Sequence, residues 1–256
     1  MTFPVIDCHA HLADERMFPR LDDILARSRQ NGLRRVLANA ARLVEFDCIA
    51  AMASKIGVAV AFGIHPVWPE DWPSAKTALE AALKSHPSAA VGEIGLDFYN
   101  GRGNQSEQET AFAEQLAMAL KYGRPVCLHN RKAWQELFGI LKTMGVSSLK
   151  GYVHNFTGSR ETAAKLLDLG LCISFAAPVT YPEANRLRDV SSYIPENKLL
   201  TETDCPDLPY VRGELTEPWQ ASNVLKCLAA ARSATVEALA ERIMQNFDSV
   251  FNTINI

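Results

Sequence analysis

The sequence predicts an α/β fold, a single (β/α)8 barrel of the TIM type with its functional residues at the carboxyl-terminal mouth. Eight short, β-branched apolar runs recur along the chain, and segments with helical spacing separate them. No low-complexity linker interrupts this alternation, and 256 residues are a usual length for one such barrel. We therefore expect one domain over residues 1–256.

The eight apolar runs are predicted to be strands that are buried on both faces. Each run is too short for a free-standing helix and too uniformly apolar for a strand with one exposed face. The runs cover residues 5–12, 35–40, 58–65, 90–96, 125–129, 149–154, 171–175 and 198–203.

Capping and breaking residues mark the helices between these strands. Ser106 and Glu109 form a predicted capping box, and Gly123 supplies the stop of the same helix. Pro182 and Pro218 suit the first turns of two later helices.

The last predicted helix, residues 235–251, follows another helix, and we expect it to close the bottom or the flank of the barrel. The competing fold is a doubly wound open sheet. No Gly-x-Gly-x-x-Gly motif follows the first strand, which disfavours that alternative.

The composition excludes several classes of protein. With 48% hydrophobic and 21% charged residues, the chain is neither a disordered tail nor a fibre. A net charge of -3 gives no basic excess for coating duplex DNA regardless of sequence. The chain shows no signal-peptide pattern at its start, no apolar run long enough for a membrane span and no Cys-x-x-Cys pair. We expect a cytoplasmic protein with reduced thiols, no membrane attachment and no obligate protein partner.

Histidines gather at the predicted strand ends. Five of the six occupy such positions, although strand ends make up only about a tenth of a barrel whose active site lies at that mouth. The five are His9, His11, His65, His129 and His154, whereas His86 is expected to be an ordinary loop residue.

This placement predicts a metal site. His9 and His11 are two residues apart on a strand, so their imidazoles point to the same side and can reach one ion. A cluster of buried polar groups with no ion to hold it would be costly, and the alternative is a hydrogen-bonded structural network. The predicted ligands suit two divalent cations with Glu93 as the bridge, and they are His9, His11, Glu93, His129, His154 and Asp204.

Several motifs occur in an order typical of one family, namely DCHAHL, GIHP, GEIGLDF, Gln108-x-x-x-Phe112, PVCLHNR, HNFTG and ETDCPDLP. Over nearly its whole length the chain resembles the TatD family of metal-dependent hydrolases, within the amidohydrolase superfamily. The resemblance implies a TIM-type barrel that hydrolyses phosphodiester bonds in DNA, often as a 3′ exonuclease, with divalent metals. It implies the same six ligands and places His65 and Arg131 near the substrate phosphate.

Four positions depart from the common pattern of that family. Asn130 and Asn155 replace the usual Ser or Cys beside ligands, and Thr216 stands where Asn is common. Asp207 follows ETDCP where many members carry Tyr. No departure removes a ligand, but the last three lie on or near loops expected to touch the substrate, so they bear on substrate preference.

The predicted groups allow a hydrolytic mechanism. Two cations (Mg2+, Mn2+ or Zn2+) would lower the pKa of a shared water toward about 7 and so supply hydroxide at physiological pH. Asp204 is the predicted proton acceptor, His65 and Arg131 would orient the phosphate, and Glu202 would orient a histidine ligand. The simpler alternatives are a helix cap for Asp204, a core histidine for His65 and a surface ion pair for Arg131.

Loops after the strands carry aromatic and arginine side chains that suit the stacking of unpaired bases and the binding of their phosphates. We therefore expect DNA with single-stranded or frayed ends as the substrate, although lid packing is the simpler role for each aromatic taken singly. The residues are Trp68, Trp72, Phe98, Tyr99, Tyr181, Tyr210 and Trp219, with Arg102, Arg186, Arg188 and Arg212.

Two other functions remain open. The first is hydrolysis of an ester, lactone or amide in a small molecule, as in other amidohydrolases. Many of those barrels bridge their metals through a modified Lys, whereas Glu93 holds that place here, which favours the phosphodiesterase. The second is a non-catalytic binding module, which predicts eroded ligands, and none of the six is missing.

Overall fold

Eight parallel strands pair in chain order in the computed structural model, which describes residues 3–99, 104–210 and 213–251. The strands are β1 (Val5–Ala10), β2 (Leu33–Asn39), β3 (Val58–Phe62), β4 (Ala90–Asp97), β5 (Val126–Arg131), β6 (Gly151–Val153), β7 (Cys172–Phe175) and β8 (Leu199–Thr201).

The first and last strands close this sheet into a barrel. The backbone N–H of Asp204 donates to the carbonyl of His9 at 3.0 Å, and that of His11 donates to Cys205 at 2.7 Å. A parallel bridge also joins Ala10 to Cys205. Because an open sheet leaves its two edge strands unpaired, this closure confirms the predicted barrel over the doubly wound alternative.

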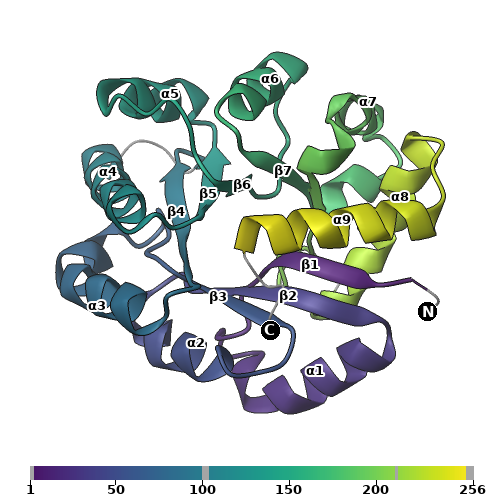
Figure 1. The fold of residues 1–256 in the computed structure, drawn as a ribbon, viewed down its shortest axis with the longest axis horizontal. Helices are drawn as coiled ribbons and strands as arrows, with labels where there is room; N and C mark the ends of the chain where they lie inside the picture. The colour runs from purple at the N-terminus through teal and green to yellow at the C-terminus, as the bar shows by residue number, and fades with distance from the viewer. Residues whose placement is uncertain (1–2, 100–103, 211–212, 252–256) are drawn as a thin grey trace.

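Helices surround the barrel, as Figure 1 shows. They are α1 (Leu21–Gln30), α2 (Phe46–Met52), α3 (Trp72–Ser85), α4 (Gln105–Tyr122), α5 (Trp134–Thr143), α6 (Arg160–Asp168), α7 (Asn185–Tyr193), α8 (Ala221–Ala231) and α9 (Val236–Phe251). Helix α3 shows why they pack there, because Ala75, Leu79 and Leu83 recur every four residues and are all fully buried. Each of the two leucines contributes about 2 kcal/mol by leaving water.

Helix α9 follows α8 and covers the amino-terminal end of the strands. The side-chain amide of Asn246 donates to the carbonyls of Glu196 and Leu199 at the start of β8. Arg35, near the start of β2, pairs with Asp248 at 2.9 Å. The last helix therefore closes the bottom of the barrel, as the sequence predicts, and leaves the opposite mouth open.

Two helix starts differ from the sequence-based prediction. The capping box at Ser106 is wrong, because α4 begins at Gln105 and Ser106 lies inside its first turn. The start is held instead by Gln108, whose amide donates to Asn104 at 2.8 Å and to the carbonyl of Asp97 at 3.0 Å. Gly123 does end the helix, in the left-handed conformation.

Of the two prolines predicted in the first turns of helices, one lies outside its helix and one begins the turn that leads into it. Pro182 precedes α7 by three residues and so does not lie in its first turn. Pro218 opens a 3-10 turn, Pro218–Gln220, that leads directly into α8.

Several strands are shorter than the apolar runs that predict them. His11, His65, His154 and Asp204 lie one to three residues beyond the ends of their strands. Single backbone bonds continue there, since the N–H of His154 donates to the carbonyl of Leu128 at 3.0 Å. These side chains therefore sit on the short loops of the mouth.

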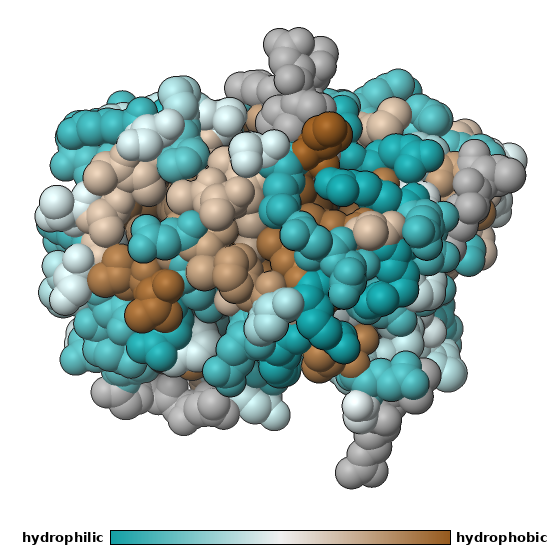
Figure 2. Space-filling view, turned by 90° about the horizontal axis from the view of Figure 1, so that it is seen from below, coloured by the Kyte–Doolittle hydropathy of each residue, from teal (hydrophilic) through white to brown (hydrophobic). Residues whose placement is uncertain are grey.

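Figure 2 shows the side of the barrel on which α1 and α2 lie, where tan to brown residues gather on the left and in the centre of the view and teal hydrophilic residues lie around them. Within the described ranges, no helix has the length and apolar character to cross a membrane. All six cysteines are free thiols, in agreement with the sequence-based expectation.

Candidate metal centre

A pocket of about 230 Å³ opens at the carboxyl-terminal mouth of the barrel. Five of the six predicted metal ligands line it, and the sixth, His9, is fully buried behind them. The lining residues are His11, Asp14, Arg16, Ala41, Glu45, His65, Trp68, Glu93, His129, His154, Asp204 and Asp207.

Glu93 occupies the centre of this arrangement. One carboxylate oxygen, Oε2, lies 3.2 Å from Nε2 of His9 and 3.2 Å from Nε2 of His11. The other oxygen, Oε1, lies 2.8 Å from Nδ1 of His129 and 2.8 Å from Nε2 of His154. Each oxygen of one buried carboxylate therefore faces its own pair of histidines.

These separations fit the binding of divalent cations. Two ligand atoms bound to one ion at about 2.0–2.2 Å lie about 2.8–3.6 Å apart at octahedral to tetrahedral angles. The ring nitrogens of His9 and His11 are 3.3 Å apart, and those of His129 and His154 are 2.9 Å apart. These His and Glu clusters could therefore hold metal, and Asp204 lies within 3.6 Å of His11 beside them.

The tautomer of His9 supports this reading. The Tyr152 hydroxyl donates to the carbonyl of Cys8 at 2.6 Å, so its oxygen accepts a proton from Nδ1 of His9 at 2.7 Å. With the proton of the neutral ring on Nδ1, the lone pair of Nε2 points at Glu93. A lone pair facing a carboxylate is the arrangement of two ligands that share an ion.

Acidic side chains hold the other two buried histidines in the same way. Asp97 contacts Nε2 of His129 at 3.2 Å, and Glu202 contacts Nδ1 of His154 at 3.3 Å. When the proton of neutral His129 lies on Nε2, Nδ1 faces Glu93 as a lone pair. The contact of His154 with Glu202 is at ion-pair distance but is not a hydrogen bond. Glu202 therefore lies beside a predicted histidine ligand, where the sequence places it.

Sequence reasoning missed Asp97 and Tyr152, although strand periodicity carries a signal for both. Asp97 lies four residues beyond Glu93 on β4, and Tyr152 lies two residues before His154 on β6. Residues separated by an even number share one face of a strand. A polar side chain that shares a strand face with a predicted ligand is thus a candidate for orienting that ligand.

His65 differs from these histidines in its hydrogen bonding. The backbone N–H of Val67 donates to Nδ1 of His65 at 3.1 Å, so the ring proton lies on Nε2, which faces the pocket. Burial lowers the pKa of His65 to about 3, which keeps the ring neutral. Although Nε2 lies 3.5 Å from Glu93, it is a hydrogen-bond donor rather than a metal ligand. The Nε2–H can therefore donate to an anionic oxygen in the pocket, and the role of His65 at a substrate phosphate stays a prediction.

The buried charged groups of the centre shift one another's pKa values. Burial alone would raise the pKa of Glu93, but the charge of His154 and the hydrogen bond from His11 hold it well below its usual value. Burial alone would lower the pKa of His11, but Asp204 and Glu93 raise it to about 10. Glu93 and Asp204 are therefore ionised, and in the absence of cations they favour protonation of His11, His129 and His154. Burial lowers the pKa of His9 and His65 and keeps those two rings neutral.

Asp204 lies in a strained position directly after β8. Its φ of 64° is in the left-handed region, which is uncommon outside glycine. The preceding residue holds it there, because Thr203 donates its backbone N–H and its hydroxyl to Asp7 at 2.9 and 2.6 Å. Lys132 and Asn155, in the loops after β5 and β6, also have positive φ values of 57° and 43°. Such strain gathers at functional sites.

Arg131 does not enter the pocket. Its guanidinium lies 3.5 Å from the ring centroid of Tyr99, on the exposed side of the mouth. Arg16, which the sequence analysis does not single out, lines the pocket instead. The structure therefore brings His65, but not Arg131, beside the candidate ligands.

The residues predicted to stack on bases do not all lie at the pocket. Trp68 lines the pocket, whereas Trp72 is buried and donates to Glu114 at 2.8 Å, so the packing alternative holds for Trp72 and base stacking does not. The guanidinium of Arg188 donates to the carbonyls of Val179, Tyr181 and Pro182, so these hydrogen bonds hold it against the backbone of its own loop. Arg102 and Arg212 lie outside the described residues.

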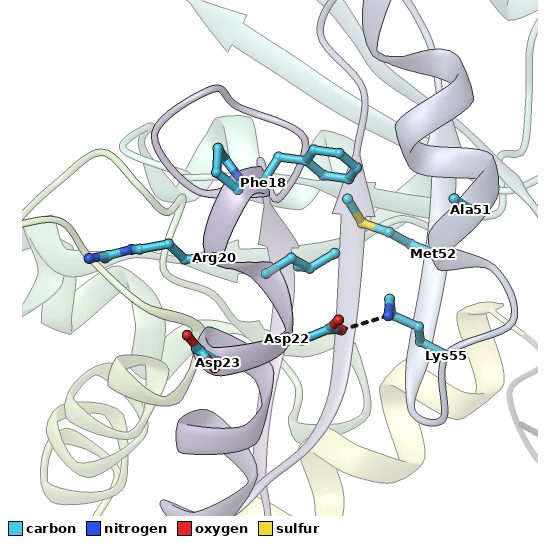
Figure 3. Close-up of a pocket in the computed structure, with 9 residues that line it drawn as sticks. Phe18, Arg20, Asp22, Asp23, Ala51, Met52 and Lys55 are labelled. Carbon is cyan, nitrogen blue, oxygen red and sulfur yellow. Dashed lines mark hydrogen bonds and ion pairs between the residues drawn. The ribbon is translucent and has the colours of Figure 1, made fainter.

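A larger hollow of about 440 Å³ lies on the outside of the barrel between α1 and α2. Figure 3 shows its lining, with Asp22 and Lys55 joined by an ion pair and Phe18 and Met52 above them. It shares no residue with the mouth pocket.

Comparison with known proteins agrees with this geometry. The family model described as TatD related DNase matches residues 6–252. An uncharacterized metal-dependent hydrolase of Escherichia coli K12, YcfH, is 32% identical and the match covers 97% of this chain and 96% of YcfH. YabD of Bacillus subtilis, named in the same way, is 31% identical, with 96% of this chain and 98% of YabD covered.

A solved structure shows the same architecture. The crystal structure of the TatD homolog YjjV from Escherichia coli superposes with a TM-score of 0.90 at 31% identity, over 97% of this chain and 98% of that one. The sequence motifs, the closed barrel and these matches agree, and the chain belongs to the TatD related DNase family.

Proposed function

We propose that the protein is a two-metal phosphodiesterase that cleaves DNA from the 3′ ends of single or frayed strands. The observation that carries the proposal is the position of Glu93, whose two carboxylate oxygens each face a separate pair of histidines at 2.8–3.2 Å. Two-metal sites of this kind suit in-line displacement at phosphorus. The DNA substrate and the 3′ polarity rest on the family resemblance.

The chain's own residues have distinct roles in this reaction. His9, His11 and Asp204 would hold one cation and His129 and His154 the other, with Glu93 between them. When bound, Mg2+, Mn2+ or Zn2+ would lower the pKa of a water and neutralise charge on the phosphate.

Two further side chains act on the substrate and the proton. His65 would donate its Nε2 proton in a hydrogen bond to a phosphate oxygen, because its Nδ1 already accepts from Val67. The carboxylate of Asp204, which is partly exposed to the pocket, would accept a proton from the attacking water.

The charge of the pocket explains why a polyanion would need the cations. The described lining contains five carboxylates and one guanidinium, a net charge of -4 when the imidazoles are neutral. Two divalent cations would bring this charge to zero. Without them, protons on His11, His129 and His154 would offset only part of this negative charge.

The test uses full-length protein that is stripped of metal and reloaded with Mg2+, Mn2+ or Zn2+. The substrates are a 5′-labelled single strand, the same strand in a duplex, and a panel of carboxyl esters, lactones and cyclic amides. We expect metal-dependent shortening of the single strand from its 3′ end. Turnover of the small-molecule panel alone would show the amidohydrolase alternative to be correct, and no turnover of any substrate would contradict both enzymatic proposals.

Two histidine variants provide the matched pair. His154→Ala removes a ligand from the centre, whereas His86→Ala removes a histidine at the end of α3 whose ring contacts the carbonyl of Ala82. We expect loss of activity in the first variant only. Equal activity in the two variants would exclude the proposed site.

A further inference from the structure

An ion-pair network crosses the rim of the mouth pocket beside the metal centre. Arg16, in the loop after β1, donates from Nε and Nη2 to the two oxygens of Asp14, both at 2.8 Å. Its Nη1 donates to Asp207, in the loop after β8, at 3.0 Å. All three residues line the pocket together with His11 and Asp204.

The two contacts of Arg16 are not equivalent. A guanidinium offers two edges for bidentate binding of an oxyanion, one formed by Nε with Nη2 and one by Nη1 with Nη2. Asp14 occupies the first edge with two bonds, and its own backbone loop fixes it, since it also accepts the N–H of Arg16 at 2.8 Å. Asp207 makes a single bond to the second edge.

The second edge is the one open to exchange. The side chain of Asp207 is 62% exposed, whereas that of Asp14 is 24% exposed. An exposed carboxylate that makes one bond gains little from it and returns to water readily. Since Arg16 and Asp207 both line the pocket, their contact lies at its rim.

Arg16 is also the single Lys or Arg side chain among the described residues that line this pocket. A phosphodiester bound at the centre has non-bridging oxygens, and an arginine edge recognises such a pair of oxygens by two parallel hydrogen bonds. Arg131, the sequence-based candidate for that role, lies over Tyr99 instead.

We propose that Arg16 is the phosphate-binding arginine of this site, that Asp14 positions it, and that Asp207 is a competing carboxylate which the substrate phosphate displaces. The inference rests on the proposed function for its substrate class. It assigns opposite effects to the two carboxylates: loss of Asp14 weakens phosphate binding, and loss of Asp207 strengthens it.

The test measures binding of inorganic phosphate to the metal-loaded protein by titration calorimetry, with metal content determined for each variant. We expect Arg16→Ala to weaken binding about 10- to 100-fold, the range for a charged hydrogen bond at a partly exposed site. Asp14→Asn should weaken it less, and Asp207→Asn should tighten it about 3- to 10-fold as the second edge becomes free. Arg27→Ala is the matched control, because Arg27 makes a bidentate pair with Glu217 away from the pocket and should leave binding unchanged.

The results separate this inference from the proposed function. Phosphate affinity that is unchanged in Arg16→Ala, or that falls in Asp207→Asn, would overturn the role of Arg16 even if the wild type cleaves DNA. Failure of metal-loaded wild type to bind phosphate would overturn it as well. If phosphate binding follows the expected order but no phosphodiester is cleaved, the assignment of Arg16 stands and the proposed reaction fails.

Discussion

The mouth pocket and the hollow between α1 and α2 differ in chemistry more than in size. The outer hollow is the larger, at about 440 Å³ against about 230 Å³. Its Asp22 and Lys55 neutralise each other at 2.7 Å. In the mouth, the two oxygens of Glu93 face ring nitrogens of separate histidines at 2.8–3.2 Å. Converging atoms that can act as metal ligands, rather than volume, indicate where a cation belongs.

The largest effect should come from the carboxylate between the two histidine pairs. Glu93→Gln preserves shape but removes the charge shared by both halves, and we expect turnover to fall by more than about 10³-fold. Asp22→Asn, the matched change in the outer hollow, should leave turnover unchanged. Steady-state rates for the two variants check the contrast, and equal rates would remove the distinction between the two regions.

A smaller loss is expected at His65, which is a donor rather than a ligand. His65→Ala should lower turnover about 10²- to 10³-fold, as for other single donors to a developing oxyanion. The metal content should stay at the wild-type value, because Nε2 carries a proton. Parallel loss of metal and activity would instead make His65 a ligand.

A change at Tyr152 tests whether the hydrogen bond to Nδ1 of His9 helps that histidine to bind metal. Tyr152→Phe removes the oxygen that accepts the Nδ1 proton of His9 at 2.7 Å. We expect metal affinity to fall about 10- to 100-fold, the usual effect of losing an outer partner of a ligand. A competition titration with a chelator measures it. Tyr122→Phe, at the end of α4 where the hydroxyl donates to Glu80 of α3, is the control and should not change metal affinity.

The pH dependence follows from the histidines of the centre. In metal-free protein the pKa of His11 is raised to about 10, from 6.5 in the unfolded chain. Its contribution to stability is therefore complete below about pH 6.5 and is lost as the pH rises toward 10. A cation must displace that proton, so binding at pH 7 should release protons and weaken as the pH falls. Calorimetry in two buffers of different ionisation enthalpy measures the release, and no release would contradict the assignment.

The smallest effect is expected in the outer hollow. Lys55→Ala removes an exposed ion pair with Asp22, and such pairs contribute little. The Tm should change by less than about 3 °C, with no change in metal affinity. A differential scanning experiment with and without Mn2+ checks both. A loss of metal affinity in Lys55→Ala would link the hollow to the centre.

The sequence predicts the barrel and the composition of the centre well, because both depend on local periodicity. Two histidines two residues apart must share a strand face, and apolar runs buried on both sides require covering helices. The chain order of β1 to β8 and the meeting of His9, Glu93 and His154 agree with those expectations.

Contacts between distant loops lie beyond such reasoning. Arg131 lies over the ring of Tyr99 and so stays out of the pocket. Arg16 lines the pocket instead, in contact with Asp207, which is 191 positions away in the sequence. The sequence places Trp72 in a loop, but in the structure its indole N–H donates to Glu114 of the neighbouring helix and the ring is buried. The proton position on His65 depends on a backbone N–H that no residue pattern reveals.

The central claim is that Glu93 joins two cation sites. Titration of metal-free protein with Mn2+, followed by electron paramagnetic resonance, tests it directly. The account predicts a spin-coupled signal that reaches its maximum at two Mn2+ per chain and disappears in Glu93→Gln. A single uncoupled Mn2+ in the wild type, or a coupled signal that survives in Glu93→Gln, would contradict it.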